Sequence, residues 1–296
     1  MNVPALLSAV GLAVASMTAP ARAFAFAPDP ACDGAGRSLP ARAVAAPSGS
    51  EFARRVATLS GIERDRAIVD ELMSGNLPEH LRHARPVVLS SALAGAAVHV
   101  TVCVLPDYLA VGSDDDFLLV PMGLAAALKL AGNLGFELPT RRIVDAIRAQ
   151  ATVRLEPRPL PAGDEMRSTA YVQRHNAIVQ AQRDDQHAAL DALTVGQKKD
   201  LVLTNRLWAA PGRVAIYGWH RLDGSAIQPL STVHGARYAD YSHGVRLVSQ
   251  VAFADGRPVS LAALLRDGTA SRIVSDEGPI ARLGDWDALL DAPADR

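Results

Sequence analysis

Apolar and polar residues follow two different periods along this chain of 296 residues, and the period changes several times. Apolar residues spaced three or four apart predict amphipathic helices, whereas apolar residues at every second position predict strands. The helical pattern occupies the segments 50–75 (two helices), 122–135, 138–155 and 170–193. Strand patterns occupy 86–91 and 97–104, then "YLAVG" and "DFLLVP", and after Lys198 the runs "DLVLTNRL", "RVAIYGWHR", "AIQPLST" and "GVRLVSQVAFADG".

This order of elements predicts an α+β protein. We expect a helix-rich N-terminal half with short strands and a β-rich C-terminal half that contains a hairpin. Residues 49–296 form one predicted α+β domain, and a sub-boundary near residue 195 fits the change from helices to strands. Asp223 and Gly224 between two strand-like runs predict a two-residue turn, which sets His220 opposite Ile227.

The N-terminal residues resemble an export signal. Residues 5–19 are uncharged and largely apolar, and Ala21 to Ala23 supply a small-x-small cleavage pattern. The run is shorter than the roughly 20 apolar residues that a bilayer-spanning helix needs. We therefore predict a signal peptide at 1–23, a flexible leader at 24–48, and an exported protein, periplasmic or extracellular, whose mature chain has no integral membrane segment. A buried N-terminal helix is the alternative, because no Lys or Arg precedes the apolar run.

Composition excludes some partners. The formal net charge is −1 and aromatic residues make up 5% of the chain, so neither a basic field nor a stacking surface indicates nucleic-acid binding. The two cysteines, Cys32 and Cys103, allow at most one disulfide. Burial of Cys103 as a small apolar residue is the other interpretation.

Residues 234–244, "HGARYADYSHG", hold the densest group of chemically active side chains. His234, Asp240 and His243 are candidate zinc ligands, since three protein ligands with a fourth open position are typical of catalytic zinc. Without a metal, His243 and Asp240 are candidate acid–base groups if the backbone turns. An extended backbone would point Ser242 and His243 to opposite faces, which excludes a contiguous Ser-His-Asp triad. A polar turn with a purely structural role is the remaining alternative.

Part of this stretch resembles a known signature. The histidine-glycine pair and the following "SHGVRL" resemble the active-site motif of L,D-transpeptidases of the YkuD type, in which a cysteine follows the second glycine. Here that position is Val245, so the resemblance does not imply a cysteine mechanism. The phrases "GSDDDF", "LPTRRIVDAI", "VAIYGWHRLDG" and "DYSHGVRLV" resemble a group of exported bacterial proteins. That resemblance implies export and assigns no catalytic residue.

We therefore expect an exported protein that acts as a hydrolase on cell-envelope or extracellular polymer. The expected centre comprises His234, Asp240 and His243, holding Zn²⁺ or acting as acid–base groups. Tyr238 or Tyr241 would polarise the scissile group, and Arg246 would orient an anionic substrate. The alternative is a non-enzymatic envelope or binding protein.

Overall fold

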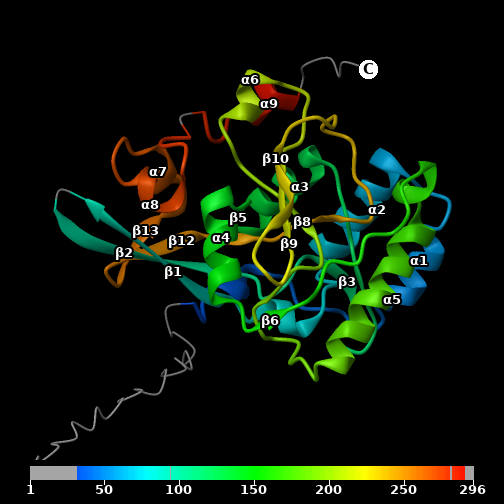
Figure 1. Ribbon diagram of the computed structural model, residues 1–296. Helices are drawn as coiled ribbons and strands as arrows, with labels where there is room; N and C mark the ends of the chain where they lie inside the picture. Colours follow the sequence, from blue (N-terminus) through cyan, green and yellow to red (C-terminus); the bar gives the residue numbers. More distant parts are fainter. Residues whose placement is uncertain (1–31, 94, 281, 291–296) are drawn as a thin grey trace, which may run out of the picture.

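The computed structural model describes residues 32–93, 95–280 and 282–290 (Figure 1). The predicted signal peptide and the first part of the predicted leader, up to residue 31, lie outside these ranges. The described part of the leader is held against the domain. Cys32 forms a disulfide with Cys103, with the two Cα atoms 5.4 Å apart, and the side chain of Leu39 is buried. Arg42 Nε donates to Asn76 Oδ1 over 2.9 Å.

The largest sheet combines strands from both ends of the sequence. Four of its strands follow the order β1-β2-β12-β13, and a short fifth strand, β5, pairs with β12. These strands are β1 (Arg85–Leu93), β2 (Ala96–Val104), β5 (Phe136–Glu137), β12 (Val248–Ala254) and β13 (Arg257–Ser260). All their pairings are antiparallel. The strands predicted at 86–91 and 97–104 are thus confirmed, and they form an antiparallel hairpin that extends from the body of the molecule (Figure 1).

The second sheet carries the stretch that the sequence singles out. Its order is β10-β9-β8-β11, and β8 and β11 run parallel. Two further sheets have two strands each, β3-β4 and β6-β7. The strands are β3 (Ala110–Gly112), β4 (Phe117–Leu119), β6 (Val153–Arg154), β7 (Thr194–Val195), β8 (Lys199–Leu201), β9 (Ile216–His220), β10 (Ala226–Ser231) and β11 (His243–Gly244).

Several helices begin or end at a residue that is typical of a helix terminus. Ser48 and Glu51 form a capping box at the start of α1, and Thr140 Oγ1 accepts from Ile143 N at the start of α4. Gly135, with φ of 80°, ends α3. The helices are α1 (Gly49–Arg55), α2 (Gly61–Met73), α3 (Leu124–Leu134), α4 (Arg141–Gln150), α5 (Thr169–Asp185), α6 (Arg206–Ala209), α7 (Leu261–Arg266), α8 (Ser271–Val274) and α9 (Trp286–Leu290), with 3₁₀ turns η1 (Ala35–Ser38), η2 (Glu79–Arg82) and η3 (Asp164–Arg167).

The predicted α+β class with a helix-rich first half and a β-rich second half is wrong. The molecule is a mixed α/β protein in which helices and strands are spread through the part of the chain that the structure describes. The main sheet joins β1 and β2, from the first half, to β12 and β13, from the second. The pairs β6-β7 and β8-β11 are parallel. These long-range pairings are invisible to local periodicity, which reports only whether a segment is helical or extended.

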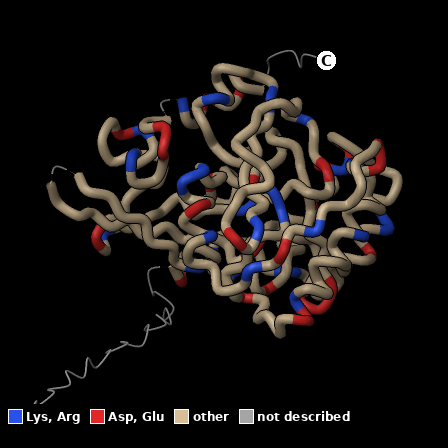
Figure 2. Tube along the Cα trace, in the orientation of Figure 1, with Lys and Arg blue, Asp and Glu red and all other residues tan. Residues whose placement is uncertain are grey.

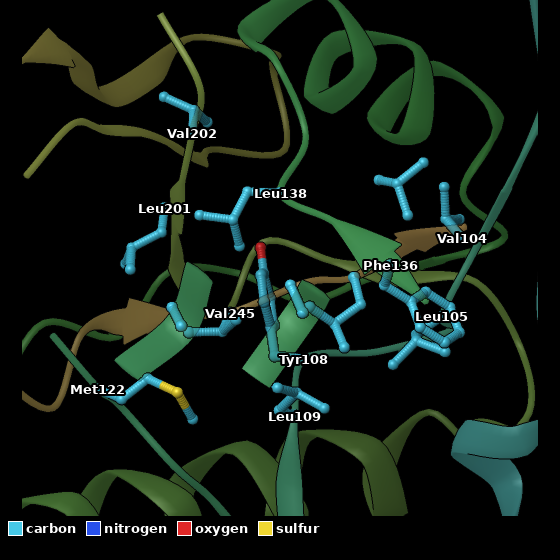
Figure 3. Packing of buried hydrophobic residues seen from close by; sticks show 14 of the residues in the cluster. Val104, Leu105, Tyr108, Leu109, Met122, Phe136, Leu138, Leu201, Val202 and Val245 are labelled. Atoms are coloured by element: carbon cyan, nitrogen blue, oxygen red, sulfur yellow. The ribbon is translucent and has the colours of Figure 1, made fainter. Parts of the chain in front are cut away.

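One hydrophobic cluster fills the interior and draws on residues from both sides of residue 195. Figure 3 shows part of it, where the ring of Tyr108 lies among Leu138, Leu201 and Val245. Val245, which follows the "SHG" sequence, has no exposed surface. Lys, Arg, Asp and Glu are dispersed along the described trace, with both signs interspersed (Figure 2).

The β9-β10 hairpin does not have the predicted two-residue turn. His220 pairs with Ala226, not with Ile227. Gly224 N donates to the carbonyl of Arg221, and Gly224 adopts a φ of 98°, which describes a type I turn followed by a left-handed glycine. The Asp223 carboxylate accepts from the backbone and the hydroxyl of Ser225 and so favours this longer turn.

The outer strand β1 is covered by a side chain of α4. Gln150 Nε2 donates to Val88 O and Gln150 Oε1 accepts from Val88 N, each over 2.9 Å. None of the helices formed by the described residues combines the length and apolar character that a membrane crossing needs.

Candidate functional site

A turn and a short parallel strand position the candidate residues. His243 N donates to Asp240 O over 3.1 Å, so the chain turns at residues 240–243 and then enters β11. There His243 pairs with Lys199 of β8, and Lys199 N donates to Ser242 O over 2.7 Å. Paired residues of neighbouring strands share a face of the sheet. The side chains of His243 and Lys199 therefore lie on the same face.

Asp240 is the anionic member of this centre and is only 1% exposed. Its Oδ1 accepts from Ser242 N over 2.7 Å and from Ser242 Oγ over 2.6 Å, and its Oδ2 accepts from the Tyr238 hydroxyl over 3.0 Å. Burial raises the pKa of Asp240, but the charge of His243 and the bonds from Ser242 outweigh burial and lower the pKa overall. The carboxylate is therefore ionised at neutral pH.

His243 has no exposed surface. Among the described residues, none forms a hydrogen bond with either of its ring nitrogens. Burial lowers the pKa of His243 to about 4, although the neighbouring Asp240 carboxylate opposes that shift. The ring is therefore a neutral imidazole at pH 7, with one lone pair and one N–H that are not hydrogen-bonded to any described residue. Most buried side-chain polar atoms in proteins have a hydrogen-bond partner, so the His243 ring is an exception to that rule.

His234 and Tyr238 are the half-buried members of the centre. Their rings stack with centroids 4.2 Å apart and an interplanar angle of 11°. The His243 ring lies 6.3 Å from the His234 ring and 5.6 Å from the Tyr238 ring. Burial lowers the pKa of His234, while burial and the Asp240 charge raise the pKa of Tyr238 to about 12. The structure thus brings together the three side chains that the sequence analysis grouped: His234, Asp240 and His243.

Tyr241 and Arg246, the other two predicted site residues, have their polar groups bonded to the backbone. The Tyr241 hydroxyl accepts from Leu160 N over 2.7 Å, and the Tyr241 side chain is buried. The Arg246 guanidinium donates to the carbonyls of Leu105 and Thr194 and lies 4.3 Å over the ring of Tyr108. With no exposed surface, Arg246 is part of the core here. Their roles toward a substrate stay predictions.

Lysines and aromatic residues that the sequence analysis did not place at the site also surround it. Lys198 is 1% exposed, and its ammonium group donates to the carbonyl of Tyr241 and contacts His175 Nδ1 at 3.2 Å. Burial lowers the pKa of Lys198 to about 7. Lys199 Nζ lies 5.4 Å over the ring of Trp219, whose φ of 51° is unusual for a residue with a Cβ.

The sequence "GQKKD" contains a feature that could have indicated the position of these two lysines. Charged residues at the start of a strand commonly protect a sheet edge. β8 is instead an inner strand, between β9 and β11. The lysine pair that leads into the apolar run "LVL" at 201–203 is the feature that could have placed Lys198 and Lys199 near the centre.

A groove of about 680 Å³ adjoins the centre at Tyr238. Its walls come from α2, α3 and the loop 235–238, so Tyr238 belongs both to the groove and to the hydrogen-bond network of Asp240. A volume of this size suits a small ligand or a short segment of a polymer.

The metal interpretation requires oxygen and nitrogen donors that are not otherwise engaged. Over the part of the chain that the structure describes, no group of three or more His, Cys, Asp and Glu residues is arranged to hold a metal ion. No described residue is hydrogen-bonded to the ring nitrogens of His243, but both oxygens of Asp240 already accept hydrogen bonds. Zinc at His234, Asp240 and His243 stays a prediction.

Comparison of the chain with models of known families, with curated proteins and with solved structures finds no match. Because both cysteines of the chain are joined in the Cys32–Cys103 disulfide, neither is a free thiol.

Proposed function

We propose that this protein is an exported hydrolase of cell-envelope or extracellular polymer, with His243 as its general base and acid. The observation that carries this proposal is the neutral, buried imidazole of His243, whose two ring nitrogens have no partner among the described residues. The Cys32–Cys103 disulfide supports export, because disulfides persist in oxidising compartments.

At neutral pH the His243 ring is a weak base, since burial lowers its pKa to about 4, and Asp240 is the neighbouring group that can stabilise its protonated form. Burial keeps the ring neutral in the resting state, so that it can accept a proton. The buried Asp240 carboxylate then stabilises the imidazolium that forms. In the hydrolytic step, His243 takes a proton from the attacking water and returns it to the leaving group, so the imidazole is regenerated as the bond breaks.

Tyr238 and His234 would control access to the base. Both rings contact His243 and both are partly exposed, so a substrate would reach His243 by displacing this stacked pair. With a pKa of about 12, the Tyr238 hydroxyl stays protonated at neutral pH. It can therefore donate a hydrogen bond to the scissile group in place of Asp240.

A non-enzymatic binding protein is the second candidate, and one observation favours it. Within the turn, the Asp240 carboxylate accepts from the backbone and the hydroxyl of Ser242, as in an ordinary Asx-turn. The hydroxyl of Tyr241 is also bonded to the backbone, at Leu160. In that case the same side chains hold the turn to the sheet and take part in no reaction.

The rates at which matched histidine variants hydrolyse the polymer distinguish the hydrolase from the binding protein. The purified protein is incubated with isolated envelope polysaccharide and peptidoglycan, and released fragments are quantified by mass spectrometry. We expect His243→Asn to lower the rate by about 10² to 10⁴, the usual contribution of an acid–base group. His99→Asn is the control, because His99 is an exposed residue of β2 whose ring is hydrogen-bonded to the Ser90 hydroxyl over 2.8 Å.

Folding of each variant is checked by circular dichroism. If His243→Asn does not fold, His234→Asn at the partly exposed position replaces it, with a reduced rate again expected. Fragment release that is equal in the wild type and both variants, or no release from any polymer, would refute the hydrolase and leave the binding protein.

A further inference from the structure

The sheet face that carries His243 also carries a positive side chain that the proton transfer described above does not use. Lys199 of β8 pairs with His243 of β11, and neighbouring strands lie about 4.8 Å apart. Lys199 is half-buried, with its ammonium nitrogen 5.4 Å over the ring of Trp219. The pKa of His234 is lowered by burial and, against the Asp240 charge, by the charge of Lys199. Lys199 therefore belongs to the same centre.

The ammonium group of Lys199 is open to a ligand. Among the described residues, no carboxylate forms an ion pair with it and no oxygen accepts a hydrogen bond from it. Its nitrogen is not one of the enclosed polar atoms, so it reaches solvent. The preceding residue differs, since Lys198 is 1% exposed and its ammonium group donates to the carbonyl of Tyr241. Of the two lysines, Lys199 is thus the one whose three donors a substrate can meet.

The acidic groups near His243 indicate which charge the centre can stabilise. Asp240, the carboxylate beside His243, accepts hydrogen bonds at both oxygens. Asp200 follows Lys199 in β8 and so faces the other side of the sheet, where its Oδ2 accepts from the Tyr108 hydroxyl over 2.9 Å. Hydrolysis of a glycosidic bond ordinarily uses two carboxylates that flank the bond, and its transition state carries positive charge on the sugar. The described centre instead combines one engaged carboxylate with an available ammonium group.

An available ammonium group stabilises negative charge on oxygen. Cleavage of an ester or amide places that charge on the carbonyl oxygen, and cleavage of a phosphodiester spreads it over the phosphoryl oxygens. A positive group fixed beside the reacting bond contributes more where water is excluded. Lys199 meets both conditions, because its stem is half-buried and its nitrogen is held over an aromatic ring.

We propose that Lys199 neutralises the negative oxygen that forms while His243 acts, and that the bond cleaved is therefore an ester, an amide or a phosphodiester and not a glycosidic bond. This inference rests on the proposed function, whose substrate class it narrows.

The step balances in both cases. With an ester or amide, His243 removes a proton from water, the hydroxide bonds to the carbonyl carbon, and the carbonyl electron pair moves to the oxygen beside Lys199. That pair then re-forms the carbonyl, the bond to the leaving group breaks, and the imidazolium returns its proton to the leaving group. With a phosphodiester, the hydroxide bonds to phosphorus and the leaving alkoxide takes the proton in the same way.

Three chromogenic substrates test the class of bond. The ester is p-nitrophenyl acetate, the phosphodiester is bis(p-nitrophenyl) phosphate, and the glycoside is p-nitrophenyl N-acetyl-β-glucosaminide. Each is incubated with the whole protein, and release of nitrophenolate is followed by absorbance. We expect release from the ester or the phosphodiester and none from the glycoside. The one that is cleaved distinguishes the two sources of negative oxygen.

Substitutions then assign the charge to Lys199. Lys199→Met keeps an aliphatic stem without the charge, so we expect kcat to fall by about 10² to 10³ with little change in KM. Lys199→Arg keeps the charge and should recover most of that loss, which a purely structural role does not predict. Lys129→Met, at an exposed lysine of α3, is the matched control and should leave kcat unchanged. Circular dichroism checks folding, and Lys199→Gln serves if Lys199→Met does not fold.

Anion binding gives a readout without turnover. Acetate and inorganic phosphate are titrated at constant ionic strength and followed by the NMR signals of the His234 ring, which are identified by their loss in His234→Asn. We expect the anion that corresponds to the cleaved bond to bind with a Kd below about 10 mM. It should bind about tenfold more weakly to Lys199→Met and equally well to Lys129→Met.

Three results would overturn this role of Lys199 and leave the hydrolase in place. They are release of nitrophenolate from the glycoside alone, a kcat of Lys199→Met equal to that of the wild type, and equal anion binding by those two proteins. Failure of the hydrolase itself has a different outcome, because the wild type then cleaves no polymer and no chromogenic substrate. In that case the substrate class is refuted together with the proposed function.

Discussion

Gly244 lies against Tyr108 so closely that a Cβ on the glycine would stand 2.5 Å from Cδ1 of the tyrosine ring and 2.8 Å from Cβ of Lys198. The glycine after His243 is therefore required by packing. The second glycine of the transpeptidase-like motif thus has a structural reason that is independent of any nucleophile. Because the ring of Tyr108 also lies beneath the Arg246 guanidinium, it cannot move away without disturbing a second buried group.

We therefore predict that Gly244→Ala is destabilising. Overpacking of this kind usually costs about 1–3 kcal/mol in the free energy of unfolding, which urea denaturation would measure. Gly268→Ala is the control, since nothing lies within 4 Å of an added Cβ there. Equal midpoints for the two variants would show that Tyr108 and its neighbours yield without penalty.

A buried ion pair joins α5 to the chain before β3. Asp107 and Arg183 bond to each other with 0% and 2% of their side chains exposed, and Asp107 Oδ1 also accepts from Gln197 Nε2 over 2.6 Å. We predict that Asp107→Asn lowers the unfolding free energy by about 3–5 kcal/mol, because the Arg183 charge is left buried. Asp285→Asn breaks the exposed pair with Arg282 and should lower it by no more than about 1 kcal/mol. Similar losses in both variants would contradict this difference in burial.

The Cys32–Cys103 disulfide closes a loop with a sequence separation of 71 residues. A cross-link over a loop of this length typically stabilises a protein by about 2–4 kcal/mol, mainly through the unfolded state. We expect the double variant Cys32→Ser/Cys103→Ser to lose that amount. Treatment with a reductant should bring the wild type to the same stability and leave the double variant unchanged. A wild type that resists full reduction without loss of stability would speak against this role.

Acid should destabilise the protein through its buried histidines. The pKa of His243 is lowered by burial from 6.5 to about 4, so between these pH values the unfolded chain binds more protons than the native state. The contribution of His243 to the free energy of unfolding is then fully present above pH 6.5. It is lost as the pH falls toward 4, by at most about 1.4 kcal/mol per pH unit for one proton. His175, with a pKa lowered by burial to about 2, acts in the same direction.

Asp200 opposes this trend. Burial raises its pKa from 3.8 to about 6, so the native state binds the extra proton and gains stability as the pH falls through that range. In chemical denaturation between pH 4 and 6.5, we expect a shallower slope for His243→Asn than for the wild type and a steeper one for Asp200→Asn. Parallel curves for the three proteins would rule out both contributions.

Metal analysis distinguishes the two chemical versions of the centre. Because both oxygens of Asp240 accept hydrogen bonds from Tyr238 and Ser242, we expect the acid–base version. Polymer hydrolysis should then survive dialysis against a chelator. One zinc per chain by mass spectrometry, lost in His234→Ala together with activity, would instead establish the zinc version.

Local features of the sequence predicted most elements of this fold. The strand patterns at 86–91 and 97–104 lie in β1 and β2, and the helical patterns at 122–135 and 138–155 contain α3 and α4. Pairings between distant segments could not be predicted in this way. The parallel contact of β11 with β8 places Lys199 beside His243, and nothing in either segment alone indicates the other.

The candidate site shows the same division. His234, Asp240 and His243 are close in sequence, so grouping them required only a turn, and the structure has one at residues 240–243. Lys198, directly before β8, and Trp219 of β9 come from other parts of the chain, and their burial depends on how the sheet is assembled. The predicted turn between β9 and β10 was one residue too short. Gly224 adopts a left-handed conformation, which allows a loop longer than the two residues Asp223 and Gly224 alone.

The bond pair between Gln150 and Val88 has a consequence for how this protein behaves at high concentration. A free outer strand can recruit a strand from a second molecule, and growth by such recruitment leads to fibrous aggregates. At Val88 the amide of Gln150 already occupies both the donor and the acceptor that an incoming strand would need. Another chain can therefore pair with β1 at Val88 only after it displaces the side chain of Gln150.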